Sequence, residues 1–278
     1  MPRPRRFAQV DVFTAKPLLG NPVAVILDAD GLSDAEMQQV ALWTNLSETT
    51  FVLPATEEGA DYRVRIFTPQ TELPFAGHPT LGTAHAVIEA GIASPSDRKL
   101  VQQCEAGLVE VMREGQELSF RLPRQVYLPV PEPEALIATF GDAVVLDEPA
   151  VIDVGPHWVI ARLASVEDFA PDLPALAAYN IHTGTTGLTV YAETGGGEIA
   201  VRSYAPTDGI AEDPVCGSGN GAVAVHRMKH AGFGDGSAYV ARQGQFIGRN
   251  GEVRVRIEGN NVHVGGECVT CIEGTFFI

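Results

Sequence analysis

The stretch that decides the fold reads Glu212-Asp213-Pro214-Val215-Cys216-Gly217-Ser218-Gly219-Asn220-Gly221, followed by the apolar run Ala222-Val223-Ala224-Val225. Its first part is polar and rich in glycine, and its second part predicts a helix over 222–231 that ends before Gly232. We therefore expect a tight loop that leads into the N-terminus of a helix. Glycine N–H groups and the positive end of a helix suit a carboxylate or a phosphate.

The predicted helix is apolar on nearly every side from Ala222 to Met228, and its polar residues gather near its end. A helix that is apolar all round is normally buried. The sequence therefore predicts a central helix with a polar mouth at the surface of the protein.

Composition and charge restrict the class of protein. The chain has 278 residues, of which 45% are hydrophobic and 19% charged, and this fits one large or two ordinary globular domains. No apolar run reaches the roughly 18 residues of a membrane span, and no signal-peptide hydrophobic region follows the N-terminus. The formal net charge of −16 argues against nucleic acid and anionic membranes as partners.

The four cysteines lie at positions 104, 216, 268 and 271. They suggest no disulfide framework, which favours a reducing cytoplasm. Cys268 and Cys271 have the spacing of a metal or redox pair, but no second pair exists. Residues i and i+3 of a strand point to opposite faces, so we interpret both as core residues and expect no metal site.

An internal repeat divides the chain into two halves. The motif Val64-Arg65-Ile66-Phe67-Thr68-Pro69 matches Val201-Arg202-Ser203-Tyr204-Ala205-Pro206, and Ala76-Gly77-His78 matches Cys216-Gly217-Ser218. Gly20 and Gly91 similarly match Gly155 and Gly232, so the offset stays between 135 and 141 residues. A persistent offset indicates duplication, and we expect a ligand site in the cleft between the two lobes.

Periodicity and turn residues predict the remaining elements. The helix over 34–44 begins at the capping box of Ser33 and Glu36. Further helices are expected over 80–90, 133–140 and 173–179, with a proline-rich linker over 123–133. Strands are expected near 7–13, 22–27, 49–53, 63–67, 99–103, 107–112, 117–122, 143–147, 157–163, 187–193, 198–204, 238–241, 245–249, 252–257, 261–265 and 268–273.

Several motifs together resemble the PhzF-like phenazine-biosynthesis isomerase family. They lie in the family's order along nearly the whole chain: Asp11-Val12-Phe13-Thr14, Gly20-Asn21-Pro22, Asn45-Leu46-Ser47-Glu48-Thr49-Thr50-Phe51, Phe75-Ala76-Gly77-His78-Pro79-Thr80-Leu81-Gly82 and Glu212-Asp213-Pro214-Val215-Cys216-Gly217-Ser218-Gly219. The resemblance is specific for the family and much less so for the substrate.

The resemblance implies an α+β protein with a diaminopimelate epimerase-like fold. In that fold two pseudo-symmetric lobes each form a β-roll or barrel around a central buried helix. We expect an N-terminal lobe over 1–125, a C-terminal lobe over 126–265, and a last strand over 266–278 that returns to the first lobe. The family also implies a homodimer and no cofactor.

The resemblance assigns catalytic roles to Glu48, His78 and Asp213. Glu48 would carry a proton from one carbon of the substrate to another, and the matched position of the second half holds Thr185. His78 would donate a proton or orient the substrate, and Asp213 would orient the reacting carbon. From the residues alone, the three side chains also suit a solvated carboxylate, a core histidine and a loop cap.

The same resemblance implies the substrate-binding residues. The Ser218 hydroxyl and the N–H groups of Gly217, Gly219 and Asn220 would hold the substrate's carboxylate, and Gly77 would offer N–H donors from the other half.

Cys216 departs from the simplest pattern, because the isomerase family often has threonine at this place. Diaminopimelate epimerases and proline racemases carry a catalytic cysteine there, together with a second cysteine whose place is taken here by Ala76. One thiol cannot supply both bases, so Cys216 stays a candidate second-site thiol or an inert small residue.

We therefore predict a cytoplasmic isomerase that moves a proton within a small carboxylate-bearing metabolite. An amino-acid epimerase or racemase that uses Cys216, and a non-catalytic metabolite-binding protein, remain as alternatives. A dinucleotide site at 219–224 is disfavoured because no strand of a βαβ unit precedes it. A cysteine hydrolase is disfavoured because ten residues of helix separate Cys216 from His226.

Overall fold

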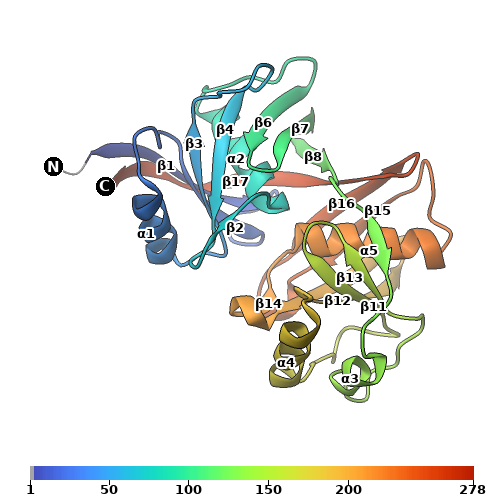
Figure 1. Ribbon diagram of the computed structural model, residues 1–278. Helices are drawn as coiled ribbons and strands as arrows, with labels where there is room; N and C mark the ends of the chain where they lie inside the picture. The colour runs from blue at the N-terminus through green and yellow to red at the C-terminus, as the bar shows by residue number, and fades with distance from the viewer. Residues whose placement is uncertain (1–2) are drawn as a thin grey trace. The chain divides into compact units, whose positions relative to one another are not determined.

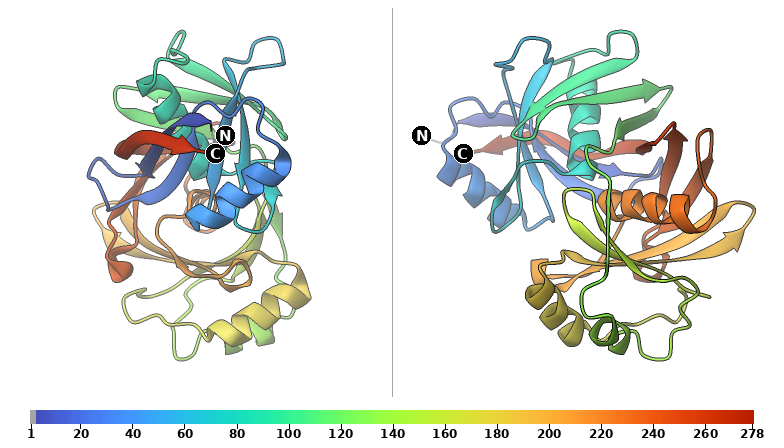
Figure 2. Two further views of the ribbon diagram at one scale, coloured as in Figure 1. Left: turned by 90° about the vertical axis from the view of Figure 1, so that its left-hand side faces the viewer. Right: turned by 45° about the vertical axis from the view of Figure 1, so that its right-hand side comes forward.

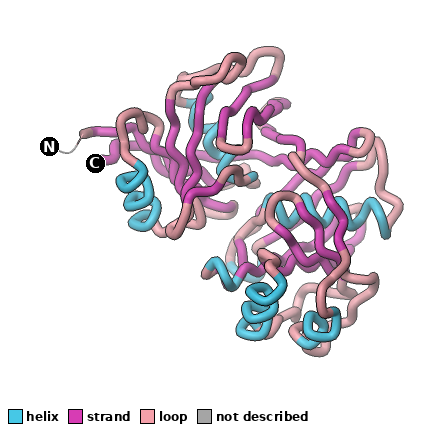
Figure 3. Tube along the Cα trace, in the orientation of Figure 1, coloured by secondary structure: helices cyan, strands magenta, loops and turns pink. Residues whose placement is uncertain are grey.

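Two units, each with a helix among its strands, make up the protein in a computed structural model that describes residues 3–278 (Figure 1). The first unit extends to Phe120 and includes Gly265–Ile278, and the second comprises Arg121–Val264. The boundaries expected from the sequence lay at residues 125 and 265. Figure 3 shows that strands form much of the ordered structure of both units.

The first unit is a closed barrel. Its helices are α1 (Asp34–Thr44) and α2 (Gly77–Glu89). Its strands are β1 (Pro4–Val12), β2 (Asn21–Ile26), β3 (Thr49–Leu53), β4 (Tyr62–Phe67), β5 (Glu72–Leu73), β6 (Lys99–Cys104), β7 (Gly107–Glu114), β8 (Glu117–Arg121) and the end of β17 (Asn261–Phe277).

The pairing of these strands closes a ring. Pairs β1–β2, β3–β4, β6–β7, β7–β8 and β17–β1 are antiparallel, whereas β2–β3 and β4–β6 are parallel. Strand β8 also pairs with β17, so eight strands close the ring within residues 3–278. Helix α2 contacts β1, β2, β3 and β6, as the sequence predicts for a central helix.

The two ends of the described chain lie side by side. Pro4 of β1 lies opposite Phe277 of β17, and the pairing continues to Val12 and Cys268. Figure 2 shows this last strand next to the first one in both views. The C-terminal residues are therefore part of the first unit.

The second unit repeats this plan. Its helices are α3 (Pro133–Ala138), α4 (Leu173–Thr183), α5 (Gly217–His230) and the short η1 (Pro206–Asp208) and η2 (Gln245–Ile247). Its strands are β9 (Val126–Leu128), β10 (Ala150–Asp153), β11 (His157–Arg162), β12 (Gly187–Gly195), β13 (Glu198–Ala205), β14 (Ile210–Asp213), β15 (Ala238–Gln243) and β16 (Gly251–Glu258). Pairs β11–β12 and β13–β15 are parallel, like β2–β3 and β4–β6.

The duplication extends to side-chain interactions. Arg65 forms an ion pair with Glu72 in the first unit at 2.6 Å, and Arg202 forms one with Glu212 in the second at 2.7 Å. Each pair fixes the short strand that leads to the central helix, β5 or β14. Helices α1 and α4 also end alike, each followed by a residue in the left-handed conformation. The repeat found in the sequence is therefore structural.

Several sequence-based boundaries are wrong. Helix α5 begins at Gly217 rather than near residue 222, and α2 begins at Gly77, because their glycines pack closely instead of forming a loop. Residues 245–249 contain the 3₁₀ helix η2, and 143–147 form only an isolated bridge through Val145. The predicted linker contains β9, which is paired with the unpredicted β10. Residues 261–277 form one strand instead of two.

No helix within residues 3–278 is both long enough and apolar enough to cross a membrane.

Helix α5 contains a buried histidine, His226. His226 is fully buried, and its Nδ1 lies 3.1 Å from the Tyr191 hydroxyl. Its Nε2 lies 3.2 Å from the carbonyl oxygen of Glu148, and its ring stacks on His230. A carbonyl oxygen only accepts hydrogen bonds, so Nε2 carries a proton. Burial lowers the pKa of His226 to about 4.

We predict that the second unit loses stability as the pH falls from 6.5 to 4. The unfolded chain binds a proton on His226 near its ordinary pKa of about 6.5, whereas the folded chain resists it until about 4. The associated loss is about 3 kcal/mol in the free energy of unfolding. Urea unfolding of His226→Gln at pH 7 and pH 4.5 should show a smaller pH dependence than the wild type.

The matched control is His182→Gln, because His182 is exposed on α4. An unchanged pH dependence in His226→Gln would contradict the assignment.

Candidate active site

Glu48 and His78 meet at the start of α2. The Glu48 Oε2 atom lies 3.4 Å from His78 Nε2, and the two side chains are 15% and 8% exposed. Glu48 lies just before β3, after the left-handed residue Asn45 that ends α1. His78 is the second residue of α2. The structure therefore brings two of the three predicted catalytic residues together.

Threonine hydroxyls hold the elements that carry this pair. The Thr83 hydroxyl of α2 donates to Thr50 of β3 at 2.8 Å, and the hydroxyls of Thr44 and Thr49 lie 2.7 Å apart on either side of the Glu48 turn. All but Thr44 are fully buried. A buried hydrogen bond loses little to competing water, so α2 and β3 are fixed relative to each other.

Gly77 allows α2 to start against the barrel wall. A Cβ atom at this position would lie 2.7 Å from Cζ of Phe120. The preceding residue, Ala76, offers no capping side chain. The Gly77 N–H group therefore belongs to the uncapped first turn of the helix, as the predicted donor role requires.

The second predicted anion-binding loop lies at the start of α5. The Gln243 side chain forms hydrogen bonds with several residues of this loop. Gln243 is fully buried, and its Nε2 donates to the carbonyl oxygen of Asp213 at 3.0 Å. Its Oε1 accepts from the Cys216 N–H group at 3.1 Å and from Asn220 Nδ2 at 2.8 Å. The Asp213 Oδ1 atom accepts from the Val215 N–H group at 2.9 Å. One oxygen of Asp213 therefore stabilises the loop that leads to α5.

Two of the N–H groups that were predicted to bind the substrate's carboxylate donate hydrogen bonds within the protein instead. The Asn220 N–H group bonds to the Cys216 carbonyl at 3.0 Å, and the Asn220 side chain is fully buried. The Gly219 N–H group donates to Cys216 Sγ at 3.2 Å. Because α5 starts at Gly217, these N–H groups lie within its first turn. Within residues 3–278 this leaves the N–H groups of Gly217 and Ser218 for a ligand.

Ser218 is the partly exposed side chain of this turn, between the buried Gly217 and Gly219. Its Oγ accepts a hydrogen bond from Trp158 Nε1 at 2.9 Å and lies 3.6 Å from Cys216 Sγ. Sequence analysis missed both Trp158 and Gln243. Trp158 lies in the repeated stretch that begins at Gly155, which was the available signal.

Strand pairing gives the counterparts of the two units. Thr50 of β3 lies opposite Ile66 of β4, and Thr189 of β12 lies opposite Ser203 of β13. Ile66 and Ser203 occupy the same place in the repeated Val-Arg motif. Thr50 and Thr189 are therefore counterparts.

Glu48 precedes the matched threonine of its unit by two residues, so its counterpart is Gly187 rather than the predicted Thr185. A Cβ atom on Gly187 would collide with the carbonyl oxygen of Tyr204 and lie 2.6 Å from Cζ3 of Trp158. The second unit therefore has no carboxylate at this place, and its packing admits no side chain there.

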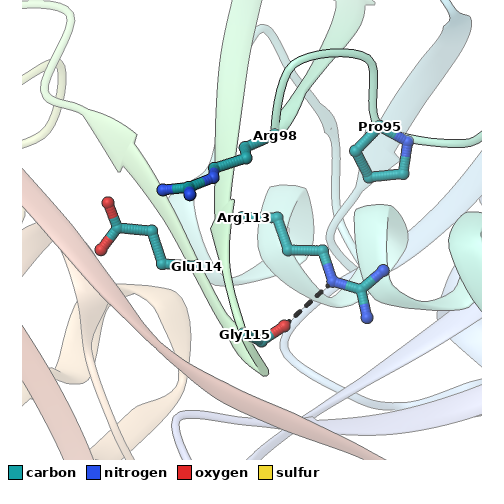
Figure 4. Close-up of a pocket in the computed structure, with 5 residues that line it drawn as sticks. All are labelled: Pro95, Arg98, Arg113, Glu114 and Gly115. Carbon is teal, nitrogen blue, oxygen red and sulfur yellow. Dashed lines mark hydrogen bonds between the residues drawn. The ribbon is translucent and has the colours of Figure 1, made fainter.

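A separate cavity of about 600 Å³ lies in the first unit. Its lining residues are Pro95, Arg98, Arg113, Glu114 and Gly115 (Figure 4). Arg113 Nε donates to the Gly115 carbonyl at 3.1 Å, and the figure shows the two guanidinium groups pointing in different directions. None of the predicted site residues lines this cavity.

Cys268 and Cys271 both lie on β17 as free cysteines. Both are only partly buried, so the prediction that they are core residues is wrong. Desolvation raises the pKa of the Cys268 thiol to about 12, which disfavours the thiolate that metal binding or redox exchange needs. No group of three or more histidine, cysteine or acidic side chains within the described residues could hold a metal ion.

Comparison with known proteins gives one consistent result. The model of the family described as phenazine biosynthesis-like protein matches residues 10–274. The chain is 36% identical over 277 residues to trans-2,3-dihydro-3-hydroxyanthranilate isomerase of Pseudomonas aeruginosa, covering 96% of this chain and 94% of the relative. It is 41% identical over 291 residues to the Schizosaccharomyces pombe protein named antisense-enhancing sequence 1, covering 98% of both chains.

Among solved structures, the PhzF-family phenazine biosynthesis protein of Bacillus anthracis superposes with a TM-score of 0.87. Its sequence identity is 26%, and the match covers 99% of this chain and all of the other. The fold predicted from the sequence is thereby confirmed.

We predict that Gly187→Ala destabilises the second unit by about 1–3 kcal/mol, the usual cost of overpacking. The added methyl group has no room between the Tyr204 carbonyl and the Trp158 ring. Gly234→Ala is the matched control, because its Cβ would meet nothing within 4 Å. Urea unfolding measures both variants. Equal free energies of unfolding would contradict the prediction, because the packing around residue 187 would then accommodate the methyl group.

Proposed function

Since the chain belongs to the phenazine biosynthesis-like protein family and is an isomerase, we propose that it moves a proton between two carbons of a small carboxylate-bearing metabolite. It does so by acid–base catalysis without a cofactor. The observation that carries this proposal is the Glu48–His78 pair at 3.4 Å. Its carboxylate has no counterpart in the second unit.

Glu48 is the proton carrier in this proposal. A carboxylate whose side chain is only 15% exposed has lost much of its contact with water. It takes a proton from a carbon made acidic by the neighbouring unsaturated or carboxylate group and returns it to a second carbon. His78, within ion-pair distance, orients the carboxylate or donates a proton to the substrate.

The start of α5 supplies the anion-binding groups. The N–H groups of Gly217 and Ser218 and the Ser218 hydroxyl lie at the positive end of the helix, which favours a carboxylate. Gly77 offers the corresponding N–H group at the start of α2. Asp213 orients the substrate from the end of β14.

The first compound to test is trans-2,3-dihydro-3-hydroxyanthranilate, which the name of the Pseudomonas aeruginosa relative gives as its substrate. It has the required features, namely a carboxylate and a ring hydrogen that can move. A thermal-shift screen of small carboxylates extends the search, since a ligand at 100 times its dissociation constant adds about 2.7 kcal/mol to the stability.

We predict that Glu48→Gln lowers turnover of this compound by about 10²–10⁴-fold, because the amide cannot accept the proton. Binding of the compound should persist, since the amide has nearly the shape of the carboxylate. Incorporation of solvent deuterium, followed by proton NMR and mass spectrometry in heavy water, measures the proton transfer directly.

Glu58→Gln serves as the control for this experiment. Glu58 is an exposed carboxylate in the β3–β4 loop of the same unit, so its loss should leave deuterium incorporation unchanged. Undiminished incorporation in Glu48→Gln would remove Glu48 from the mechanism.

One observation keeps epimerisation as a second candidate. Cys216 precedes α5, and its Sγ accepts the Gly219 N–H group. The corresponding residue of α2 is Ala76, so a second thiol is missing there.

We predict that Cys216→Ser retains activity within a few-fold, because the serine oxygen preserves the hydrogen bond to Gly219. Cys216→Ala should be less stable by about 1 kcal/mol, the usual value of a helix cap. A thiol base would instead make both substitutions inactive in the deuterium assay, and that result would favour the epimerase.

A further inference from the structure

The two central helices carry different partners at their second residue. His78 of α2 lies beside the Glu48 carboxylate, whereas Ser218 of α5 accepts a hydrogen bond from the Trp158 indole. His78 and Ser218 occupy the same place in the repeated motif. The second unit therefore replaces an acid–base pair with a hydroxyl and an indole.

Trp158 also differs from the residue at the matching position of the first unit. Thr50 pairs with Val25 of β2, and its counterpart Thr189 pairs with Ile160 of β11. Two residues earlier on these strands lie Val23 and Trp158, which are therefore counterparts. The valine of the first unit thus corresponds to a tryptophan in the second, where it pairs with Gly187.

The large Trp158 ring fills space beside Gly187 in the second unit. The Trp158 ring lies 2.6 Å from the place where Gly187 would carry a Cβ atom, and Trp158 is 3% exposed. The backbone carbonyl oxygen of Tyr204 lies closer still to that place. A side chain at residue 187 would therefore collide with both the backbone and the indole.

The hydrogen bond from Trp158 also determines what Ser218 can do. An indole N–H group only donates, and a serine hydroxyl has one proton to donate. With Trp158 Nε1 donating to Oγ at 2.9 Å, the Ser218 proton must point elsewhere. Cys216 Sγ, at 3.6 Å, is a weak acceptor for it.

We infer that Trp158 is a positioning residue that presents the Ser218 hydroxyl as a donor to the carboxylate of the substrate. An anionic oxygen is a much better acceptor than a thiol sulfur, so the hydroxyl turns from Cys216 to the ligand. The inference rests on the proposed function for the identity of the ligand.

Phenylalanine at position 158 tests the N–H group while keeping an aromatic ring. Trp158→Phe should raise KM for trans-2,3-dihydro-3-hydroxyanthranilate about tenfold, which corresponds to about 1.4 kcal/mol, and change kcat much less. In a Ser218→Ala background the same substitution should have no further effect on KM, because Trp158 acts through Ser218. An equal effect of Trp158→Phe in both backgrounds overturns the inference.

A second measurement does not depend on turnover. The chain has two tryptophans, and Trp43 is 74% exposed, so Trp43→Phe leaves one indole signal in a ¹⁵N spectrum. In Trp43→Phe/Glu48→Gln, adding the same compound should shift the Trp158 N–H resonance, and Ser218→Ala should abolish that shift. A resonance that stays unmoved at saturation, or absence of binding, overturns the inference.

The two measurements also separate this inference from the proposed function. If the wild type binds the compound without turning it over, the proposed function fails for that compound while the indole shift still reports the contact. If Trp158→Phe unfolds, a benzothienylalanine residue at position 158 in the Trp43→Phe protein replaces the N–H group by sulfur in a ring of nearly the same size. Loss of the indole donor should then weaken binding about tenfold, and unchanged binding overturns the inference.

Discussion

The close approach of each central helix to its own barrel wall is the constraint on which the site depends. At Gly77 the ring of Phe120 occupies the place of a side chain, and at Gly219 the Thr189 hydroxyl lies 2.6 Å from the position of a Cβ atom. Glycine is a poor helix residue, costing about 1 kcal/mol relative to alanine. It is used here because a side chain would push the first turn away from the wall. The N–H groups and the residues His78 and Ser218 are placed by this contact.

Duplication produced two similar helix starts, and local packing made them different. The first unit carries Glu48 beside His78. The second unit has Gly187 at the place of Glu48, with the Tyr204 carbonyl oxygen and the Trp158 indole against it. Buried polar side chains, above all Gln243 and Asn220, then fix the second helix start from within. One helix start thus carries a carboxylate beside a histidine and the other a hydroxyl beside an indole, although the two units arose by duplication.

The architecture could be predicted because the motifs resemble a known family and because the internal repeat indicates two similar halves, while periodicity and capping are local signals for single elements. Helix α1 was predicted with its boundaries because its capping box and its inward residues Met37, Val40 and Ala41 are all nearby in the chain. The start of α5 was misplaced, since glycine favours a loop unless a wall lies against it, and that wall is distant in sequence. Trp158 was missed for the same reason: 60 residues separate it from Ser218. The inward orientation of Asn220 likewise depends on Gln243, which belongs to β15.

Strand β17 has a consequence for how the protein is made. Its last residues lie opposite β1 and complete the ring that begins at the other end of the chain. During synthesis the N-terminal half therefore emerges with two unsatisfied strand edges, at β1 and β8, and it keeps them until β17 has been made. The internal half has its strands through β16 available earlier. Folding on the ribosome should begin with the internal half, the reverse of the usual N-terminal-first order, and the exposed edges would invite aggregation or chaperone binding in the interval.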